Sequence, residues 1–149
     1  MRNKRSWLAG IVDGEGCIQI VRMWRRTDYS YRPEIHITNT NKLILNETSK
    51  LIEIITGKKT KMFPTKNGNP KIVYRVRLQD KNSCLALIKS LLPFLIGKRK
   101  QAIILLEYLK AKSSNRKIKA MQAARIRRIN SGSSHQEPQR LNAKPQVRG

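Results

Sequence analysis

Hydrophobic and polar residues alternate along this chain with two different periods. Apolar residues spaced three or four apart predict helices over residues 4–14, 43–55, 82–95 and 102–112. Alternation of single apolar and polar residues predicts strands over residues 17–24, 34–38, 58–63 and 72–79. Because a hairpin followed by a helix occurs twice, the pattern predicts an α+β protein of order αββαββα. This order implies a four-stranded antiparallel sheet with helices on one face and an open second face.

Turn and cap signals support several of these boundaries. The segment 39–41 offers side-chain caps for the second helix, and Gly57 is a stop signal for it. Asn67-Gly68 is a signal for a tight hairpin turn between the last two predicted strands.

The outward residues of the predicted sheet are mostly long and polar. They alternate with apolar residues that point to the helices, and they are Gln19, Val21, Met23, Arg25, Glu34, His36, Thr38, Lys59, Lys61, Arg75, Arg77 and Gln79. Arginine can bind guanine through two hydrogen bonds, and glutamine can bind adenine in the same way. A ten-residue strand spans roughly 33 Å, the rise of roughly ten base pairs. These residues could therefore bind DNA, although a sheet face that only contacts water has the same pattern.

Charge makes a polyanionic partner the better interpretation. The 149 residues hold 32 Lys and Arg against 9 Asp and Glu, a net charge of +23. Nucleic acid would relieve this self-repulsion. An anionic membrane surface is the alternative, but it favours cations gathered on one amphipathic helix, and here they are spread along the chain. The longest apolar runs are too short to cross a membrane, and the basic start has no apolar signal region after it.

The cysteines and the C-terminal part complete the domain prediction. Cys17 and Cys84 form neither a disulfide framework nor a zinc pattern, so we expect buried thiols in an intracellular protein. Residues 1–112 are predicted to form the core domain. Residues 113–149 are predicted to form a basic helix and a tail with too little apolar content to fold alone.

The stretch WLAGIVDGEG, residues 7–16, combines small residues with two acids. On a helical wheel its small arc, predicted to be a helix–helix contact, consists of Ala9, Gly10, Asp13 and Gly14. Small residues allow close helix approach, and the chain has no second copy of the stretch, so the simplest partner is an identical subunit. Glu15 of each subunit would then meet near the two-fold axis. Two such carboxylates need a cation between them, and Mg²⁺ with DNA phosphates would form a phosphodiester hydrolysis site.

Other interpretations of this stretch are weaker. Asp13 could be purely structural, bridging backbone amides at the end of the helix. A calcium loop starting at Asp13 is excluded, because it needs glycine and glutamate where the chain has Ile18 and Trp24.

Residues 8–16, LAGIVDGEG, resemble the signature of the LAGLIDADG homing endonucleases position by position. Residues 35–41 resemble the exit of the family's second strand, and residues 92–102 resemble the segment before its last core helices. The resemblance covers residues 6–112 and implies the family's αββαββα fold with a saddle-shaped sheet. A single motif copy implies the homodimeric branch.

The resemblance also implies roles for individual residues. Glu15 matches the acidic metal ligand, and Gly14 matches a residue whose backbone carbonyl approaches the metal. Lys98 matches a basic residue that polarises water or stabilises the transition state. Asn39 matches a polar residue that orders water, although a cap for the following helix is the alternative role that its position favours. Asp13 is expected to tie down the motif helix.

The sequence therefore predicts a homodimeric, Mg²⁺-dependent DNA endonuclease that makes a double-strand break at a long pseudo-palindromic site. Mn²⁺ and Ca²⁺ are further ions that such a site accepts. The expected partners are double-stranded DNA and a second copy of the chain, with no membrane. No protein-splicing domains flank the core, so a free-standing, intron-encoded enzyme in a prokaryotic cytoplasm or an organelle is expected. The alternative function is that of an intron RNA-binding maturase without catalytic activity.

Overall fold

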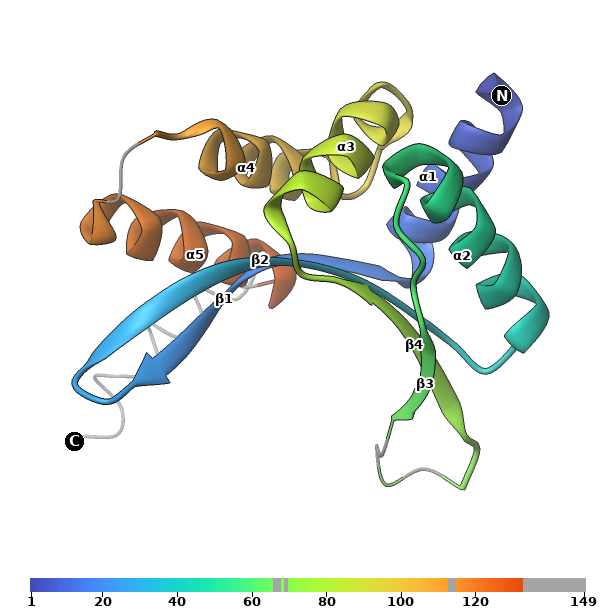
Figure 1. The fold of residues 1–149 in the computed structure, drawn as a ribbon, viewed down its shortest axis with the longest axis horizontal. Helices are drawn as coiled ribbons and strands as arrows, with labels where there is room; N and C mark the ends of the chain where they lie inside the picture. The colour runs from blue at the N-terminus through green and yellow to red at the C-terminus, as the bar shows by residue number, and fades with distance from the viewer. Residues whose placement is uncertain (66–67, 69, 113–114, 133–149) are drawn as a thin grey trace, which may run out of the picture.

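The computed structural model describes residues 1–65, 68, 70–112 and 115–132. Helices and strands follow the predicted order, and the predicted basic helix follows at the C-terminal end (Figure 1). In chain order they are α1 (Arg2–Glu15), β1 (Gly16–Arg25), β2 (Asp28–Asn39), α2 (Lys42–Thr56), β3 (Met62–Thr65), β4 (Val73–Leu78), α3 (Lys81–Leu91), the 3₁₀ turn η1 (Leu92–Phe94), α4 (Arg99–Lys110) and α5 (Arg116–Asn130).

The four strands form one antiparallel sheet in the order β1-β2-β4-β3. The two hairpins therefore meet through β2 and β4 at the centre, and β1 and β3 are the edge strands. All five helices lie on one side of the curved sheet, and no described element covers the other side (Figure 1). The predicted α+β class, the four-stranded antiparallel sheet and its open face are confirmed.

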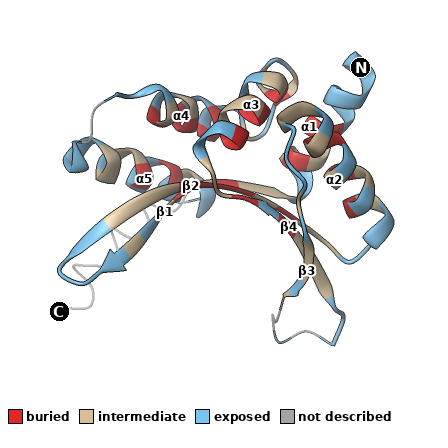
Figure 2. Cartoon of the chain, in the orientation of Figure 1, coloured by how far each residue is buried: buried red, intermediate tan, exposed pale blue. Residues whose placement is uncertain are grey.

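The hydrophobic core fills the layer between the helices and the sheet (Figure 2). Ile18, Ile20, Ile35 and Ile37 are at most 5% exposed, which confirms the alternation predicted for the first hairpin. Burying such side chains contributes about 1.5–3 kcal/mol each and holds the register, because a slip by one residue would turn them to the open side.

Several helix ends follow the local signals in the sequence. Asn41 caps α2 by accepting a hydrogen bond from Leu43 N at 2.9 Å, and Gly57 ends this helix in the left-handed conformation with φ of 74°. The third helix is shorter than predicted, because it passes into η1 where Pro93 has no N–H to donate. Of the residues predicted as a hairpin turn, Asn67 lies outside the described residues.

The third strand is also shorter than predicted. β3 begins at Met62, so Lys59 and Lys61 lie in the exposed connection before it and not on the sheet, and the prediction that they project from a strand is wrong. Ser49 Oγ of α2 donates to Thr60 O at 3.2 Å, and Lys58 Nζ is 2.6 Å from Asp80 Oδ1. These contacts hold the connection against α2 and the start of α3, away from β4.

Helix α5, predicted to be a basic helix, packs on the sheet. Its Ala123 and Ile126 belong to the hydrophobic core, and Asn130 Nδ2 donates to Ile18 O at 3.0 Å. Tyr108 of α4 donates to Tyr31 O of β2 at 3.1 Å in the same region. The core thus includes α5 in addition to residues 1–112. The tail was predicted for residues 131–149, of which 133–149 lie outside the described residues. No helix in the described part of the chain is long and apolar enough to cross a membrane.

Candidate functional site

Helix α1 ends beside the open sheet face, and this end carries an acid. Glu15 is the last residue of the helix and is exposed, and Gly16 starts β1 directly after it. No Cβ would fit at Gly16 in this conformation, because it would lie 2.7 Å from Val12 O. The glycine therefore allows the tight passage from helix to strand that sets Glu15 at the border of the sheet.

Asp13 ties the end of α1 to the segment before α4. Its carboxylate accepts hydrogen bonds from Ile96 N at 2.8 Å and from Lys98 N at 2.9 Å. In return, Lys98 Nζ donates to the backbone carbonyl of Asp13 at 2.6 Å. These contacts join residues 83 and 85 positions apart in the chain. They bring the ammonium group of Lys98 to the same helix end as Glu15, and they agree with the structural role expected for Asp13.

The donor set at this helix end fits part of a metal site. Glu15 offers one exposed carboxylate, and the end of a helix offers carbonyl oxygens, both hard ligands that Mg²⁺ accepts. No group of three or more His, Cys, Asp or Glu among the described residues could hold a metal ion. Further ligands would have to come from a second subunit and from DNA phosphates.

The exposed stripe of α1 differs in part from the predicted arc of small residues. Ala9 is fully buried in the core of its own subunit, so its prediction as a dimer-interface residue is wrong. Asp13 is half-buried and engaged with residues 96–98. The exposed residues are Gly10 and Gly14, where an added Cβ would meet no atom within 4 Å, together with Trp7, which is 40% exposed. Ala9 is buried, and not exposed as predicted, because α1 packs against α3 and η1 in addition to the sheet.

Asn39 is the last residue of β2, and strand pairing sets this end of β2 beside the start of β1, directly after α1. It follows by two residues Ile37, which pairs with Gly16. Its Oδ1 accepts a hydrogen bond from Asn41 N at 2.8 Å, so its carboxamide supports the turn into α2. A catalytic role for Asn39 stays a prediction.

Ten predicted outward residues lie on the surface that we call the open face. Its members are Gln19, Val21, Met23 and Arg25 of β1, Glu34, His36 and Thr38 of β2, Arg75 and Arg77 of β4, and Gln79 just after β4. Strand pairing sets Gln19 opposite Glu34, His36 opposite Arg77 and Thr38 opposite Arg75. The nitrogen atom Nε of Arg75 is buried and has no hydrogen-bond partner among the described residues.

Glu34 is the one acid at the centre of this face, and it is buried. Only 5% of it is exposed, and it lies in a cluster with Gln19, His36 and Gln79 that we call the Glu34 cluster. Its Oε1 accepts from Gln19 Nε2 at 2.8 Å and lies 3.0 Å from His36 Nδ1, and its Oε2 accepts from Gln79 Nε2 at 2.6 Å. Glu34 was predicted to contact DNA. Because it is buried and its neighbours enclose its carboxylate, that prediction is corrected.

The same hydrogen bonds govern the titration of Glu34. The bond from His36 is the largest cause that lowers the pKa of Glu34 from 4.5 to about 2; burial opposes it, and the bonds from Gln79 and Gln19 add to it. Glu34 is therefore ionised at neutral pH. Because it accepts only, Nδ1 of His36 must carry the hydrogen.

This shift predicts a loss of stability in acid. A lowered pKa in the folded state stabilises the protein above the pKa of the unfolded chain, and the stabilisation is lost as pH falls from about 4.5 through about 2. We expect the free energy of unfolding of the wild type to fall across this range by up to about 3 kcal/mol more than that of Glu34→Gln. Urea unfolding of both proteins at several pH values measures the difference. Parallel pH curves for the two proteins would contradict it.

The sequence did not identify two further features, one beside the open face and one at the tip of the β1–β2 hairpin. Phe63 of β3 lies under Arg77, with the guanidinium carbon 5.0 Å from the ring centre, which holds this arginine against the sheet. Phe63 pairs with Arg75 and shares its face, a placement that the wrong start of the third strand concealed.

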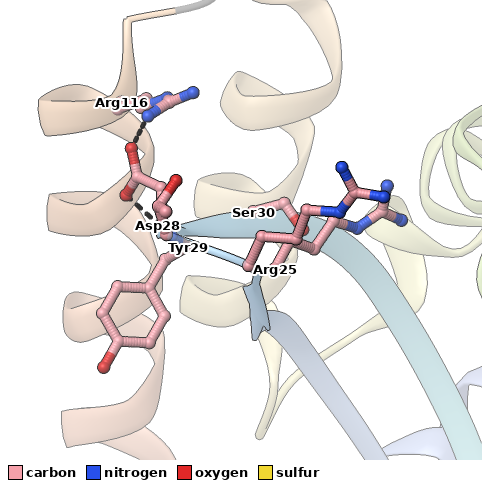
Figure 3. Close-up of a pocket in the computed structure, with 7 residues that line it drawn as sticks. Arg25, Asp28, Tyr29, Ser30 and Arg116 are labelled. Atoms are coloured by element: carbon pink, nitrogen blue, oxygen red, sulfur yellow. Dashed lines mark hydrogen bonds and ion pairs between the residues drawn. The ribbon is translucent and has the colours of Figure 1, made fainter.

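The second feature is a hollow at the tip of the β1–β2 hairpin (Figure 3). Arg116 of α5 forms an ion pair with Asp28, whose Oδ1 also accepts from Tyr29 N at 2.7 Å. Arg25 and Arg26 line the same hollow, and Arg26 has a φ of 48° in the tight turn. With three arginines and one aspartate, the hollow has the charge that attracts a phosphate. Only the tertiary fold could reveal it, because Arg116 belongs to the predicted basic helix, far from the hairpin in the sequence.

Comparisons with known proteins connect this geometry to a fold. No family model and no curated protein matches the chain. Solved structures do match: the homing endonuclease I-CvuI, in complex with its target, has a TM-score of 0.70 at 23% identity, covering 86% of this chain and 82% of that chain. The archaeal intron-encoded homing endonuclease I-Vdi141I, complexed with DNA, has a TM-score of 0.55 at 17% identity, covering 87% and 98%. The LAGLIDADG homing endonuclease I-GzeII, also in complex with a DNA target, has a TM-score of 0.57 at 14% identity, covering 84% and 43%.

These matches agree with the signature at residues 8–16 and with the observed order of helices and strands. They extend over most of the chain and include proteins that are as short as this one. The chain therefore has the fold of the LAGLIDADG homing endonucleases, with a single copy of the motif.

Proposed function

We propose that this protein is a site-specific DNA endonuclease that works as a homodimer and needs a divalent metal ion, with Mg²⁺ as the cofactor for cleavage. The observation that carries the proposal is the end of α1. There the exposed Glu15 and the ammonium group of Lys98, which Asp13 holds in place, lie at the border of a cationic sheet face. The structural matches in complex with DNA support the choice of substrate.

Each part of the surface has a task in this proposal. The open face lies along the DNA groove, and its arginines and glutamines contact base edges. Lys59 and Lys61, in the connection before β3, contact phosphates at the rim, as does the hollow at the hairpin tip. A half-site for each subunit follows from the two-fold symmetry, which makes the target pseudo-palindromic.

Glu15 and the carbonyl of Gly14 would hold the metal, which supplies an activated water and stabilises charge on the scissile phosphate. Lys98 is positioned to donate to a phosphate oxygen or to this water, since its ammonium group is fixed by the carbonyl of Asp13 at 2.6 Å. Asn39 would orient water at the same helix end. Mn²⁺ and Ca²⁺ have the same preference for oxygen ligands and are expected to bind there as well.

The exposed glycines of α1 support the homodimer and allow a sharp test. Gly10 is helical and exposed, so Gly10→Ala should leave the fold intact or stabilise it by up to about 1 kcal/mol. The added methyl group would separate two α1 helices that touch at this residue, so we expect dimerisation to weaken at least about tenfold. Sedimentation equilibrium measures dimerisation, and thermal melting measures the fold. Asn46→Ala, at an exposed position on α2, is the control, and it should change neither the dimerisation affinity nor the melting temperature.

The function itself is tested by selection and cleavage. The full-length protein is incubated with a pool of randomised duplex DNA and Mg²⁺, and the cleaved ends are captured and sequenced. We expect paired cuts on both strands within one enriched, pseudo-palindromic sequence, and no cuts in EDTA. Enrichment of no sequence, or cutting that persists in EDTA, would refute the proposal.

The remaining parts of the proposal concern biology. We infer that the enzyme is intron-encoded and acts where its DNA target is, inside the cell or organelle. A maturase that binds only RNA is not favoured, because the matching structures named above are DNA complexes of endonucleases.

A further inference from the structure

The Glu34 cluster raises a question about how the open face reads DNA. A carboxylate on a face that binds DNA would repel phosphates, or it would accept a hydrogen bond from the amino group of cytosine. Glu34 does neither while it is 5% exposed and its two oxygens are occupied by Gln19, His36 and Gln79. Its partners, not Glu34 itself, are the groups that remain able to contact a base.

The charge of Glu34 fixes the direction of both partner amides. An ionised carboxylate only accepts hydrogen bonds, so the NH₂ end of each glutamine must point to it. The Nε2 atoms of Gln19 and Gln79 lie 2.8 and 2.6 Å from its oxygens. Turning either amide around would set two oxygens at these distances, which is repulsive. Each amide oxygen, Oε1, is therefore directed away from Glu34, and one N–H of each amide is left over.

This arrangement matches one base better than the others. In the major groove, adenine offers the N6 amino group as a donor and N7 as an acceptor, which the outward Oε1 and the remaining N–H of a glutamine satisfy together. Guanine offers two acceptors, O6 and N7, and an amide held with its oxygen outward sets Oε1 against O6. A free glutamine could turn its NH₂ group to guanine, whereas one held by Glu34 cannot.

We propose that Glu34 is a positioning residue that makes Gln19 and Gln79 select adenine over guanine, because it fixes the direction of both amides. The proposal rests on the DNA-binding function proposed above, and it adds how two positions of each half-site are read. Because Gln19 and Gln79 flank Glu34 from two different strand segments, one acid controls two separate base pairs.

The test measures base preference at each position rather than overall affinity. The full-length protein selects bound sequences from a randomised duplex pool in EDTA, so that the DNA is recovered uncut. We expect two adenine positions per half-site, each preferred over guanine at least about tenfold. Gln19→Ala should remove one preference and Gln79→Ala the other. Glu34→Gln should reduce both to about twofold, because a neutral amide at residue 34 no longer dictates the direction of its neighbours.

The control is Glu107→Gln, which makes the same change from acid to amide at an exposed position of α4, away from the open face, and should keep both adenine positions. Both adenine preferences surviving Glu34→Gln, or all positions weakening alike, would overturn the positioning role. If the wild type enriches a sequence but the two glutamine variants lose no adenine position, the role is also overturned. If the wild type enriches no sequence at all, the proposed function itself fails, so the two failures are distinguishable.

A second variant covers the case in which Glu34→Gln does not fold, which circular dichroism shows. Glu34→Asp keeps the charge but is one methylene shorter and cannot reach both amides at once. We expect it to lose at least one adenine preference. Retention of both would overturn the proposal.

Discussion

Replacement of Glu15 by glutamine should abolish DNA cleavage and leave DNA binding in place. Glutamine has the same shape but no charge, so it is a poor ligand for Mg²⁺ at the end of α1. We expect the rate of double-strand cleavage to fall more than about a thousandfold, which corresponds to about 4 kcal/mol of transition-state stabilisation. Single-turnover cleavage of the selected target measures the rate, and gel retardation measures binding.

The position of Glu15 makes this result specific. Its side chain is exposed and forms no hydrogen bond with the side chains or backbone of the described residues, so its replacement should change the free energy of unfolding by less than about 0.5 kcal/mol. Glu107 is an exposed acid on α4, far from Glu15 in the sequence. Glu107→Gln makes the same change in charge there, and this variant should cleave at the wild-type rate. Cleavage by Glu15→Gln at a rate near that of the wild type would exclude it as the metal ligand.

Asp13→Ala should damage both the fold and the chemistry. It removes the carboxylate that accepts from Ile96 N and Lys98 N, and thus leaves two backbone donors without their partner. We expect a loss of about 2 kcal/mol, or about 4–8 °C in melting temperature. We also expect at least a tenfold slower cleavage, because the backbone N–H of Lys98 loses its partner and the segment that carries Lys98 is held less firmly against the helix end. Thermal melting and single-turnover cleavage at 20–25 °C measure the two effects.

A matched destabilising variant separates these effects. Asp80 caps α3 by accepting from Ser83 N at 2.9 Å, and it pairs with Lys58. Asp80→Ala should cost a similar stability, about 1–2 kcal/mol, without touching the end of α1. Below its melting temperature it should cleave at the wild-type rate. If Asp13→Ala does the same, the positioning of Lys98 by Asp13 does not matter for the reaction.

Much of the fold was predictable because its signals are local. The alternation around Ile18 and Ile35 defined a hairpin with one buried side, and Gly57 marked the end of α2 through its left-handed conformation. The third strand was not predictable in this way. Its start depends on the contact between Ser49 of α2 and Thr60 of the connection before β3, which forms only in the folded chain.

The position of the candidate site in the fold was predictable, but the contacts of its residues were not. Periodicity placed Glu15 at the end of a helix, yet it set Ala9 on the exposed side, because a helical wheel does not show how many neighbours enclose a short helix. The burial of Glu34 depends on partners from two other strand segments. Likewise, Arg116 reaches Asp28 only because α5 packs on the sheet. Such long-range contacts carry no signal in a single sequence.

The shared carboxylate has a consequence for changing the specificity of this protein. Gln19 and Gln79 depend on one residue, so substitutions at these two positions are not independent, and their effects on target choice should not add. A new residue at position 19 or 79 that cannot donate to Glu34 would remove one of the hydrogen bonds that stabilise this negative charge, on the face proposed to bind a polyanion. Retargeting, whether by natural drift to a new site or by protein engineering, would therefore have to replace residues 19, 34 and 79 as one unit.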